Sequence, residues 1–163
     1  MISYADIASP VGRLLVAATE RGLCGIYFEE HRHFKGKEGW RHNADHPIVR
    51  AAVHQLEEYF AGTRTGFDLP LDLHGTPFQQ EVWQQLLRIP FGATVSYGEH
   101  ARAVGRPKAA RAAGAAIGRN PVSIVVPCHR VIGSNGSLTD YAGGLERKRT
   151  LLELESRQER LAA

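Results

Sequence analysis

Residues 94–117 read TVSYGEHARAVGRPKAARAAGAAI, and this stretch decides how the second half of the chain folds. A short helix is predicted to follow residues 94–98 and to end near Val104 and Gly105, and another is predicted over 108–117, introduced by Pro107. Two short helices joined by a tight turn that contains glycine form the helix-turn-helix pattern. The second helix is almost entirely Ala and Gly, so its backbone can closely approach another helix or a nucleic-acid groove.

Positive charge is concentrated around this motif. Residues 101–130 contain six Lys and Arg residues and no acidic residue, and Lys108 and Arg111 fall on one face of the second helix. Residues 76–163 carry a net charge of +5, whereas residues 1–75 carry −2. Tight helix packing alone would explain the small residues, but the clustered charge favours a DNA-binding surface in the second half.

The remaining elements divide the chain at about residue 75. Strands are predicted over residues 2–7, 14–18, 23–28 and 69–73. Helices are predicted over residues 47–60, 76–89 and 145–160. The polar segment 29–46 is expected to be a surface loop, and the apolar β-branched run 123–126 a further strand. We therefore predict an α/β domain over 1–75 and a mainly helical domain over 76–163.

Composition excludes several classes of protein. The chain has 163 residues, 43% hydrophobic and 23% charged, which is the balance of a globular protein. No apolar run approaches the roughly 18 residues of a membrane span, and no signal peptide is visible at the N-terminus. Two cysteines cannot form a disulfide framework. These features predict a cytoplasmic protein without a membrane partner.

Cys128 and His129 are the residues best suited to covalent chemistry, within the segment IVVPCHRVIG at 124–133. Only a thiolate is a competent nucleophile, and an adjacent imidazole with nearby positive charge commonly produces one. Neighbours on an extended chain point apart, so contact between them needs a bridging water or a turn at Pro127. A buried structural cysteine at the end of a strand remains an alternative reading. Cys24 has no basic neighbour and is expected in the core.

Residues 133–144 contain four glycines and are expected to form a close-approach loop. Such a loop suits the wall of a pocket for a planar ligand, with Tyr97 or Tyr141 supplying stacking, although a plain connecting loop is the alternative. The only faint metal-binding cluster is His31 and His33 with Cys24 nearby. Because no CxxC or HExxH pattern accompanies it, surface histidines and no metal site are predicted.

Five segments together resemble the O6-alkylguanine-DNA alkyltransferases, also called methylated-DNA–protein-cysteine methyltransferases. The segment 127–131, Pro-Cys-His-Arg-Val, is similar to the active-site signature of that family. The other four match in order and spacing, and they are residues 91–98, 107–112, 118–121 and 141–145. The resemblance is strong over residues 76–155 and holds only in outline over the first 75.

This resemblance implies a small ribonuclease-H-like α/β domain followed by a winged-helix-like DNA-binding domain. It implies repair of DNA by direct reversal of damage. The alkyl group of O6-alkylguanine, and of O4-alkylthymine, would pass irreversibly to the protein's own cysteine after the base is flipped out of the duplex. The protein would be a monomer that approaches double-stranded DNA from the minor groove, reacts once per molecule and needs no cofactor.

The resemblance also assigns roles to individual residues. Cys128 would be the nucleophile, His129 the general base acting through a water, and Glu155 the residue that orients His129. Asn120 would support the turn that carries the cysteine, and Tyr97 would press on the DNA backbone and donate a hydrogen bond to the guanine ring. Arg111 would replace the flipped base in the stack, and the other expected DNA contacts are Lys108, Ala109, Ala110, Ala112 and Arg130. The expected substrate-pocket residues are Tyr141, Ala142, Gly143 and Val131.

Some features depart from the family pattern. Some relatives have a serine where this chain has Ala142, and Asp140 brings an acidic side chain into the pocket loop. The cysteines that hold a structural zinc in some relatives are missing, so no metal is expected.

Three other functions fit the sequence less well. A non-catalytic binder of alkylated DNA usually replaces the cysteine, often by tryptophan, so Cys128 argues against it. A thiol hydrolase would need oxyanion donors and has no use for a basic helix-turn-helix. A transcription regulator would leave Cys128 and His129 without a role.

Overall fold

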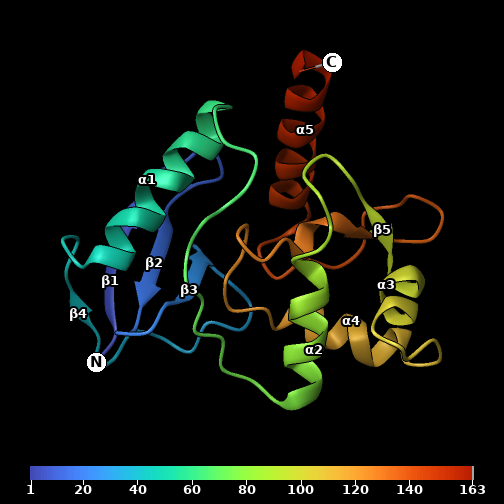
Figure 1. The fold of residues 1–163 in the computed structure, drawn as a ribbon, viewed down its shortest axis with the longest axis horizontal. Coiled ribbons are helices and arrows are strands. Elements are labelled where there is room, and N and C mark those ends of the chain that lie inside the picture. The colour runs from blue at the N-terminus through green and yellow to red at the C-terminus, as the bar shows by residue number, and fades with distance from the viewer. Residues whose placement is uncertain (163) are drawn as a thin grey trace.

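A computed structural model describes residues 1–162 of the chain, with side chains through Arg157. Its first half is a four-stranded sheet covered by one helix (Figure 1). The strands are β1 (Ser3–Ile7), β2 (Leu14–Ala18), β3 (Leu23–Phe28) and β4 (Arg41–His42), and the helix is α1 (Pro47–Ala61). The sheet order is β3-β2-β1-β4, with β1, β2 and β3 antiparallel and β4 parallel to β1.

Helix α1 packs on the sheet through one apolar face. Its buried residues Val49, Ala52, Leu56 and Tyr59 recur every three or four positions, which places them on the same side of the helix. The helix ends at Gly62, whose φ of 82° lets its backbone N–H reach the carbonyls of the last turn. All five residues of β2 are buried, because this strand lies inside the sheet and beneath α1.

The second half is mainly helical. Its helices are α2 (Pro77–Leu86), α3 (Tyr97–Ala103), α4 (Ala110–Gly118) and α5 (Leu145–Ala162), with the 3₁₀-helix η1 (Cys128–Arg130). Strands β5 (Val95–Ser96) and β6 (Val131–Ile132) pair in parallel. Capping boxes fix the starts of α2 and α3, formed by Thr76 with Gln79 and by Ser96 with Glu99. The predicted α/β half followed by a helical half is confirmed.

The predicted strand over 123–126 is wrong, because these residues form a buried turn. The Asn120 side chain holds the turn at both ends: its oxygen accepts from the Val122 N–H at 3.0 Å, and its amide donates to the Val126 carbonyl at 2.8 Å. Ile124 within the turn has a φ of 74°, a strained value for a β-branched residue. Local hydrogen bonding from Asn120 has therefore overridden the strand propensity of this run.

Two other expectations are also corrected. Residues 69–73 do not form a strand, and Leu71 makes only an isolated parallel bridge with Leu23. The polar segment 29–46 is not wholly loop, since it contains β4 at the edge of the sheet.

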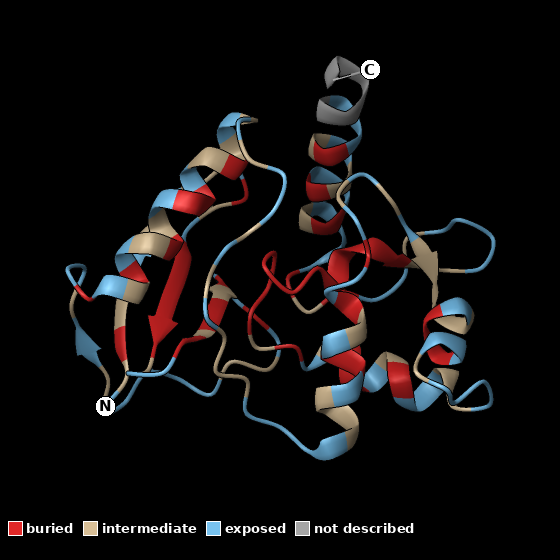
Figure 2. Ribbon diagram, viewed as in Figure 1, coloured by how far each residue is buried: buried red, intermediate tan, exposed pale blue. Residues whose placement is uncertain are grey.

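The two halves are joined through the turn that precedes Cys128. Ile26 of β3 donates to the Pro121 carbonyl at 2.9 Å and accepts from the Ser123 N–H at 3.3 Å, which makes a bridge between Ile26 and Val122. Figure 2 shows buried residues running from the sheet and the inner side of α1 into the loops at the centre of the molecule. The cysteine-bearing turn is thus anchored on the edge of the first-half sheet. Among the described residues, no helix has the length and apolar character needed to cross a membrane.

Candidate active site

The turn from Asn120 to Arg130 presents Cys128 at the start of η1, with 6% of the residue exposed. Asn120 is itself 2% exposed, and both ends of its amide are used in the turn. Successive residues of a 3₁₀-helix are rotated by about 120°, so the side chains of Cys128 and His129 diverge. His129 therefore points away from the cavity and into the protein interior, where it is fully buried.

A buried carboxylate, that of Glu155 on α5, organises this interior. It accepts hydrogen bonds from the Tyr59 hydroxyl at 2.6 Å and from His129 Nε2 at 2.7 Å. Arg130 donates to both of its oxygens, from Nε at 2.8 Å and from Nη2 at 3.0 Å, and also donates from Nη1 to the Ile89 carbonyl at 2.6 Å. The network thus connects α1 and α5 with the 3₁₀-helix that carries the cysteine.

Charge states in this network follow from burial and pairing. Burial opposes ionisation of Glu155, but the hydrogen bonds from His129 and Arg130, together with the positive charge of Arg130, outweigh it and lower the pKa of Glu155 to about 2. Burial lowers the pKa of His129, which therefore stays neutral at neutral pH. Since Nε2 faces the carboxylate, Nε2 carries the imidazole proton. Nδ1 has no hydrogen-bond partner within the described residues, so its lone pair can accept a proton.

The Cys128 thiol needs such a base. Burial raises its pKa above the ordinary value, while the Asn120 amide and the positive charge of Lys148 act in the opposite direction. Lys148 is fully buried, and its ammonium donates to the carbonyls of Thr139 and Asp140 at 3.2 and 3.3 Å. Sequence reasoning missed this lysine. Its place on α5, four residues after Gly144, gave no sign that it would turn inward beneath the pocket loop.

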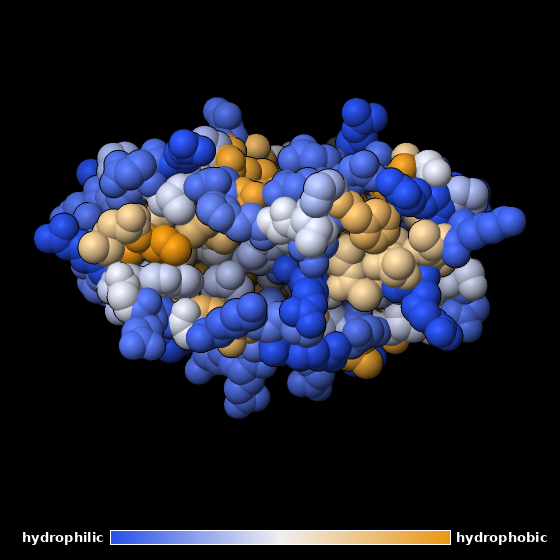
Figure 3. Space-filling view, turned by 90° about the horizontal axis from the view of Figure 1, so that it is seen from below, coloured by the Kyte–Doolittle hydropathy of each residue, from blue (hydrophilic) through white to orange (hydrophobic). Residues whose placement is uncertain are grey.

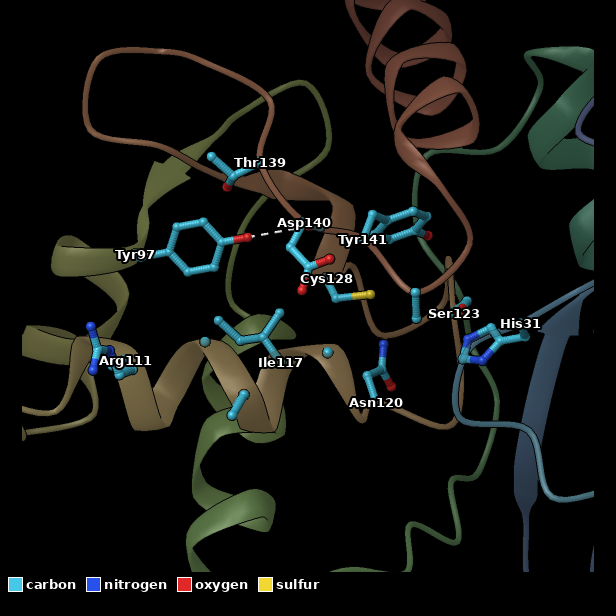
Figure 4. Close-up of a pocket in the computed structure, with 14 residues that line it drawn as sticks. His31, Tyr97, Arg111, Ile117, Asn120, Ser123, Cys128, Thr139, Asp140 and Tyr141 are labelled. Carbon is cyan, nitrogen blue, oxygen red and sulfur yellow. Dashed lines mark hydrogen bonds between the residues drawn. The ribbon is translucent and has the colours of Figure 1, made fainter.

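A cavity of about 250 Å³ opens beside the cysteine. In Figure 4, Tyr97 and Arg111 lie toward one end and His31 lies at the other, with the sulfur of Cys128 between them. The Tyr97 hydroxyl donates to the Asp140 carbonyl at 3.4 Å, so the loop 139–142 forms one wall and α4 forms the opposite one. The cavity has the size and the single reactive sulfur expected of a pocket that holds one planar group.

The structure brings most of the predicted site residues together, but not all. Cys128, Asn120, Tyr97, Arg111, Tyr141 and Ala142 line the cavity. Gly143 does not: a Cβ at this position would lie 2.5 Å from the Phe28 ring, so the glycine allows close packing against β3 rather than forming pocket wall. Val131 does not either, because it is fully buried in β6. Neither residue belongs to the lining of this cavity, and their contact with a bound base stays a prediction.

The structure places Arg130 in the protein interior, away from the other residues predicted to contact DNA. Its side chain is 7% exposed and its guanidinium is bound to Glu155 and to the Ile89 carbonyl. The remaining predicted DNA contacts cluster at α4, where Lys108, Arg111 and Ala112 are exposed and Ala109 and Ala110 are half-buried. In Figure 3, the half of the molecule that holds α3 and α4 presents a moderately hydrophobic area bordered by hydrophilic side chains. Small residues and positive charge thus share one surface.

The first half of the chain also reaches the cavity, which sequence reasoning missed. His31, expected at the surface, is 7% exposed and lines the cavity. Its neighbour Arg32 donates a backbone hydrogen bond to the Ala142 carbonyl at 3.2 Å and forms an ion pair with Asp140 at 2.6 Å. The acidic residue in the pocket loop therefore joins the two halves across the mouth of the site. No group of three or more potential metal ligands occurs in the part of the chain that the structure describes.

Comparisons with known proteins agree with this geometry. Residues 2–73 match the ribonuclease-like domain, and residues 77–157 the DNA binding domain, of 6-O-methylguanine DNA methyltransferase. The chain is 51% identical to the methylated-DNA–protein-cysteine methyltransferase of Mycobacterium bovis, over 95% of this chain and 93% of the relative. It is 48% identical to the protein of that name from Methanosarcina acetivorans, over 93% and 97% of the two chains.

Solved structures give the same result. The crystal structure of Mycobacterium tuberculosis OGT in complex with DNA superposes with a TM-score of 0.88 at 49% identity, covering 96% of this chain and 94% of the other. An O6-methylguanine DNA methyltransferase from Methanococcus jannaschii superposes with a TM-score of 0.65 at 26% identity, covering 93% of each chain. From its sequence, its fold and the arrangement around Cys128, this chain belongs to the 6-O-methylguanine DNA methyltransferase family.

Proposed function

We propose that this protein repairs duplex DNA by transferring the alkyl group of O6-alkylguanine, and of O4-alkylthymine, irreversibly to Cys128. One observation carries the proposal. The single cysteine that lines the cavity is followed by a buried neutral histidine whose Nε2 is bound to the carboxylate of Glu155 at 2.7 Å. A water that bridges the thiol and His129 Nδ1 would complete the relay that converts a thiol into a nucleophile, with Glu155 orienting the base.

The proposed reaction starts with proton transfer. A bridging water passes the thiol proton of Cys128 to Nδ1 of His129, and Glu155 stabilises the imidazolium that forms. The thiolate attacks the alkyl carbon in line with the bond to O6. A C–S bond forms, the C–O6 bond breaks, and the electron pair leaves on the guanine. Guanine regains one proton, which balances the one lost by the thiol, so no cofactor is consumed.

The product explains why each molecule would act once. A thioether is chemically stable, and no group of the described site is placed to cleave it. Tyr97, whose hydroxyl lies at the cavity wall, would assist departure of the guanine by donating a hydrogen bond to its ring. Asn120 would hold the cysteine-bearing turn in place during attack.

DNA would be engaged through α4. Arg111 is both exposed and part of the cavity lining, which suits a side chain that fills the gap left by a flipped base. The small residues Ala109, Ala110 and Ala112 allow the helix to lie close against the minor groove, and Lys108 would contact the phosphates. The cavity opens next to this helix, so a base leaving the duplex would enter it directly.

We further propose that the protein acts as a monomer in the cytoplasm. The exposed large hydrophobic residues of the described chain, Met1, Leu87 and Leu145, lie on separate elements and form no single patch of the kind that marks an oligomer interface. An alkyl acceptor must keep its sulfur as a free thiol, and a reducing compartment favours that state for the unpaired Cys128.

A stoichiometry experiment tests the transfer. Limiting protein is mixed with excess duplex that contains one O6-methylguanine, and repaired oligonucleotide is counted when the reaction stops. We expect a plateau at one repaired lesion per protein molecule, a plateau of zero for Cys128→Ser, and an unchanged plateau for the matched control Cys24→Ser. Repeated turnover would contradict irreversible transfer. Tight binding of the duplex without repair would instead identify a lesion-binding protein.

A further inference from the structure

His31 forms the end of the cavity opposite Arg111 and Tyr97 (Figure 4). It belongs to the first half of the chain, three residues beyond the end of β3, and it is 7% exposed. Neither of its ring nitrogens has a hydrogen-bond partner within the described residues. Buried polar groups are normally satisfied, and leaving one without a partner destabilises a fold. An unpartnered imidazole in a pocket wall is therefore expected to have a functional reason.

The surroundings of His31 keep its ring in place and without charge. The ring stacks on Phe28, with 6.2 Å between centroids and an interplanar angle of 8°, and meets the edge of Tyr27 at 5.2 Å. Burial, reinforced by positive charge on His33, Arg32 and Arg147, lowers the pKa of His31 to about 4. At neutral pH the ring is neutral, so it offers one hydrogen-bond donor and one acceptor.

The loop that carries His31 is fastened to the pocket. Arg32 is bound to Ala142 and Asp140, as described above. Arg147 of α5 donates to the Glu29 carbonyl at 3.0 Å and to the Gly143 carbonyl at 3.2 Å, which joins the segment before His31 to the segment after the pocket wall. His31 is thus held at a fixed position relative to the cysteine.

The geometry of the reaction assigns this end of the cavity to the alkyl group. A flipped base enters from the end near Arg111 and Tyr97, and the reacting carbon must lie at the sulfur of Cys128. In Figure 4 that sulfur lies on the path from Tyr97 to His31. Substituents on the reacting carbon project sideways from the S–C–O line into the free part of the cavity, whose end is formed by His31. A methyl group ends before His31, whereas a longer alkyl chain extends toward it.

We propose that the His31 end of the cavity is a subsite for the distal part of the transferred alkyl group, and that its imidazole favours chains ending in a hydrogen-bonding group over hydrocarbon chains of the same size. O6-(2-hydroxyethyl)guanine and O6-propylguanine form such a pair, because they differ by a hydroxyl in place of a methyl group. This inference rests on the proposed alkyl transfer to Cys128.

The test measures single-turnover rates of the full-length protein with three duplexes of one sequence, carrying O6-methyl-, O6-(2-hydroxyethyl)- or O6-propylguanine. One hydrogen bond gained in the pocket is worth about 3- to 10-fold in rate, so the hydroxyethyl lesion should react that much faster than the propyl lesion. His31→Phe keeps an aromatic ring against Phe28 but cannot hydrogen bond, and we expect the ratio to fall to about 1. The matched control is His33→Phe, which alters a side chain outside this cavity and should keep the wild-type ratio.

The methyl lesion tests alkyl transfer to Cys128 separately from the His31 subsite, because its alkyl group does not reach His31. Failure of the wild-type protein to react with it would overturn alkyl transfer itself. If methyl transfer occurs but the two larger lesions react equally, or if their ratio survives His31→Phe, the subsite is refuted. Should His31→Phe fail to fold, His31→Leu provides the same comparison. A wild-type protein that repairs the hydroxyethyl lesion no faster than the propyl lesion overturns the subsite without any variant.

Discussion

Replacing Glu155 by glutamine is the sharpest perturbation of the buried network behind Cys128. The Glu155 carboxylate accepts four hydrogen bonds, from Tyr59, His129 and Arg130. Glutamine has the same shape but no charge, and its amide nitrogen is a donor where the carboxylate has an acceptor. The Arg130 guanidinium then stays buried without its carboxylate. Breaking a buried ion pair in this way costs about 3–5 kcal/mol. For a protein of this length, that lowers the melting temperature by about 6–20 °C.

The assay is thermal and urea unfolding of Glu155→Gln beside two controls. Tyr59→Phe removes one hydrogen bond to the carboxylate without stranding a charge, so it should cost less, about 1.5–3 kcal/mol. Glu153→Gln changes an exposed glutamate on the same helix and should stay within about 0.5 kcal/mol of the wild-type protein. The expected order of destabilisation is Glu155→Gln, then Tyr59→Phe, then Glu153→Gln. A Glu155→Gln protein as stable as Glu153→Gln would refute the structural role assigned to this carboxylate.

Three further predictions concern the DNA surface, the pH dependence and the cysteine-bearing turn. Lys108→Ala should weaken duplex binding about equally for all sequences. Titration at several salt concentrations should show that the binding constant depends less steeply on salt, by the contribution of about one phosphate contact. An unchanged salt dependence would show that Lys108 is not part of the interface. The pKa of His31 is lowered from 6.5 to about 4, so the unfolded chain binds its proton first as the pH falls. Stability from this group is complete above pH 6.5 and is lost toward pH 4, by about 3 kcal/mol at most. Calorimetric melting between these limits should therefore show a shallower pH dependence in His31→Phe, and equal slopes would contradict the burial of a neutral ring. Asn120→Ala removes both hydrogen bonds that hold the strained turn around Ile124, so it should lower the free energy of unfolding by about 1–3 kcal/mol and slow methyl transfer. Asn120→Asp keeps only the acceptor, so its stability and its rate should lie between those of Asn120→Ala and the wild-type protein. A wild-type rate for Asn120→Ala would contradict the role of the turn.

The elements with strong local signals could be predicted from the sequence. Capping residues, prolines and regular apolar spacing located α1 and α2 to within a few residues, and the helix-turn-helix followed from two short helices around a glycine turn. The run 123–126 was misread because β-branched residues favour strands. The determinant of its structure is a side-chain amide three residues earlier, which a propensity argument does not weigh.

The differences between the expected and the observed positions of the site residues share a physical cause. Arg130 lies in a basic segment close to the reactive cysteine. Only the position of Glu155 on α5 shows that the Arg130 guanidinium is paired with a carboxylate inside the protein. The burial of His31 arises from packing between two halves of the chain, and no local pattern encodes it. Contacts between residues distant in sequence decide both cases, so composition and spacing could not reveal them.

The central claim is that Cys128 accepts the alkyl group, and peptide mass spectrometry tests it most directly. The protein reacts in a single turnover with duplex containing one O6-methylguanine and is then digested with trypsin, which releases residues 120–130 with Cys128 as their only cysteine. The account predicts that this peptide gains the mass of one methylene unit, as methyl replaces the thiol hydrogen, while the peptide carrying Cys24 is unchanged and guanine is restored in the oligonucleotide. Restored guanine with an unmodified Cys128 peptide would contradict it.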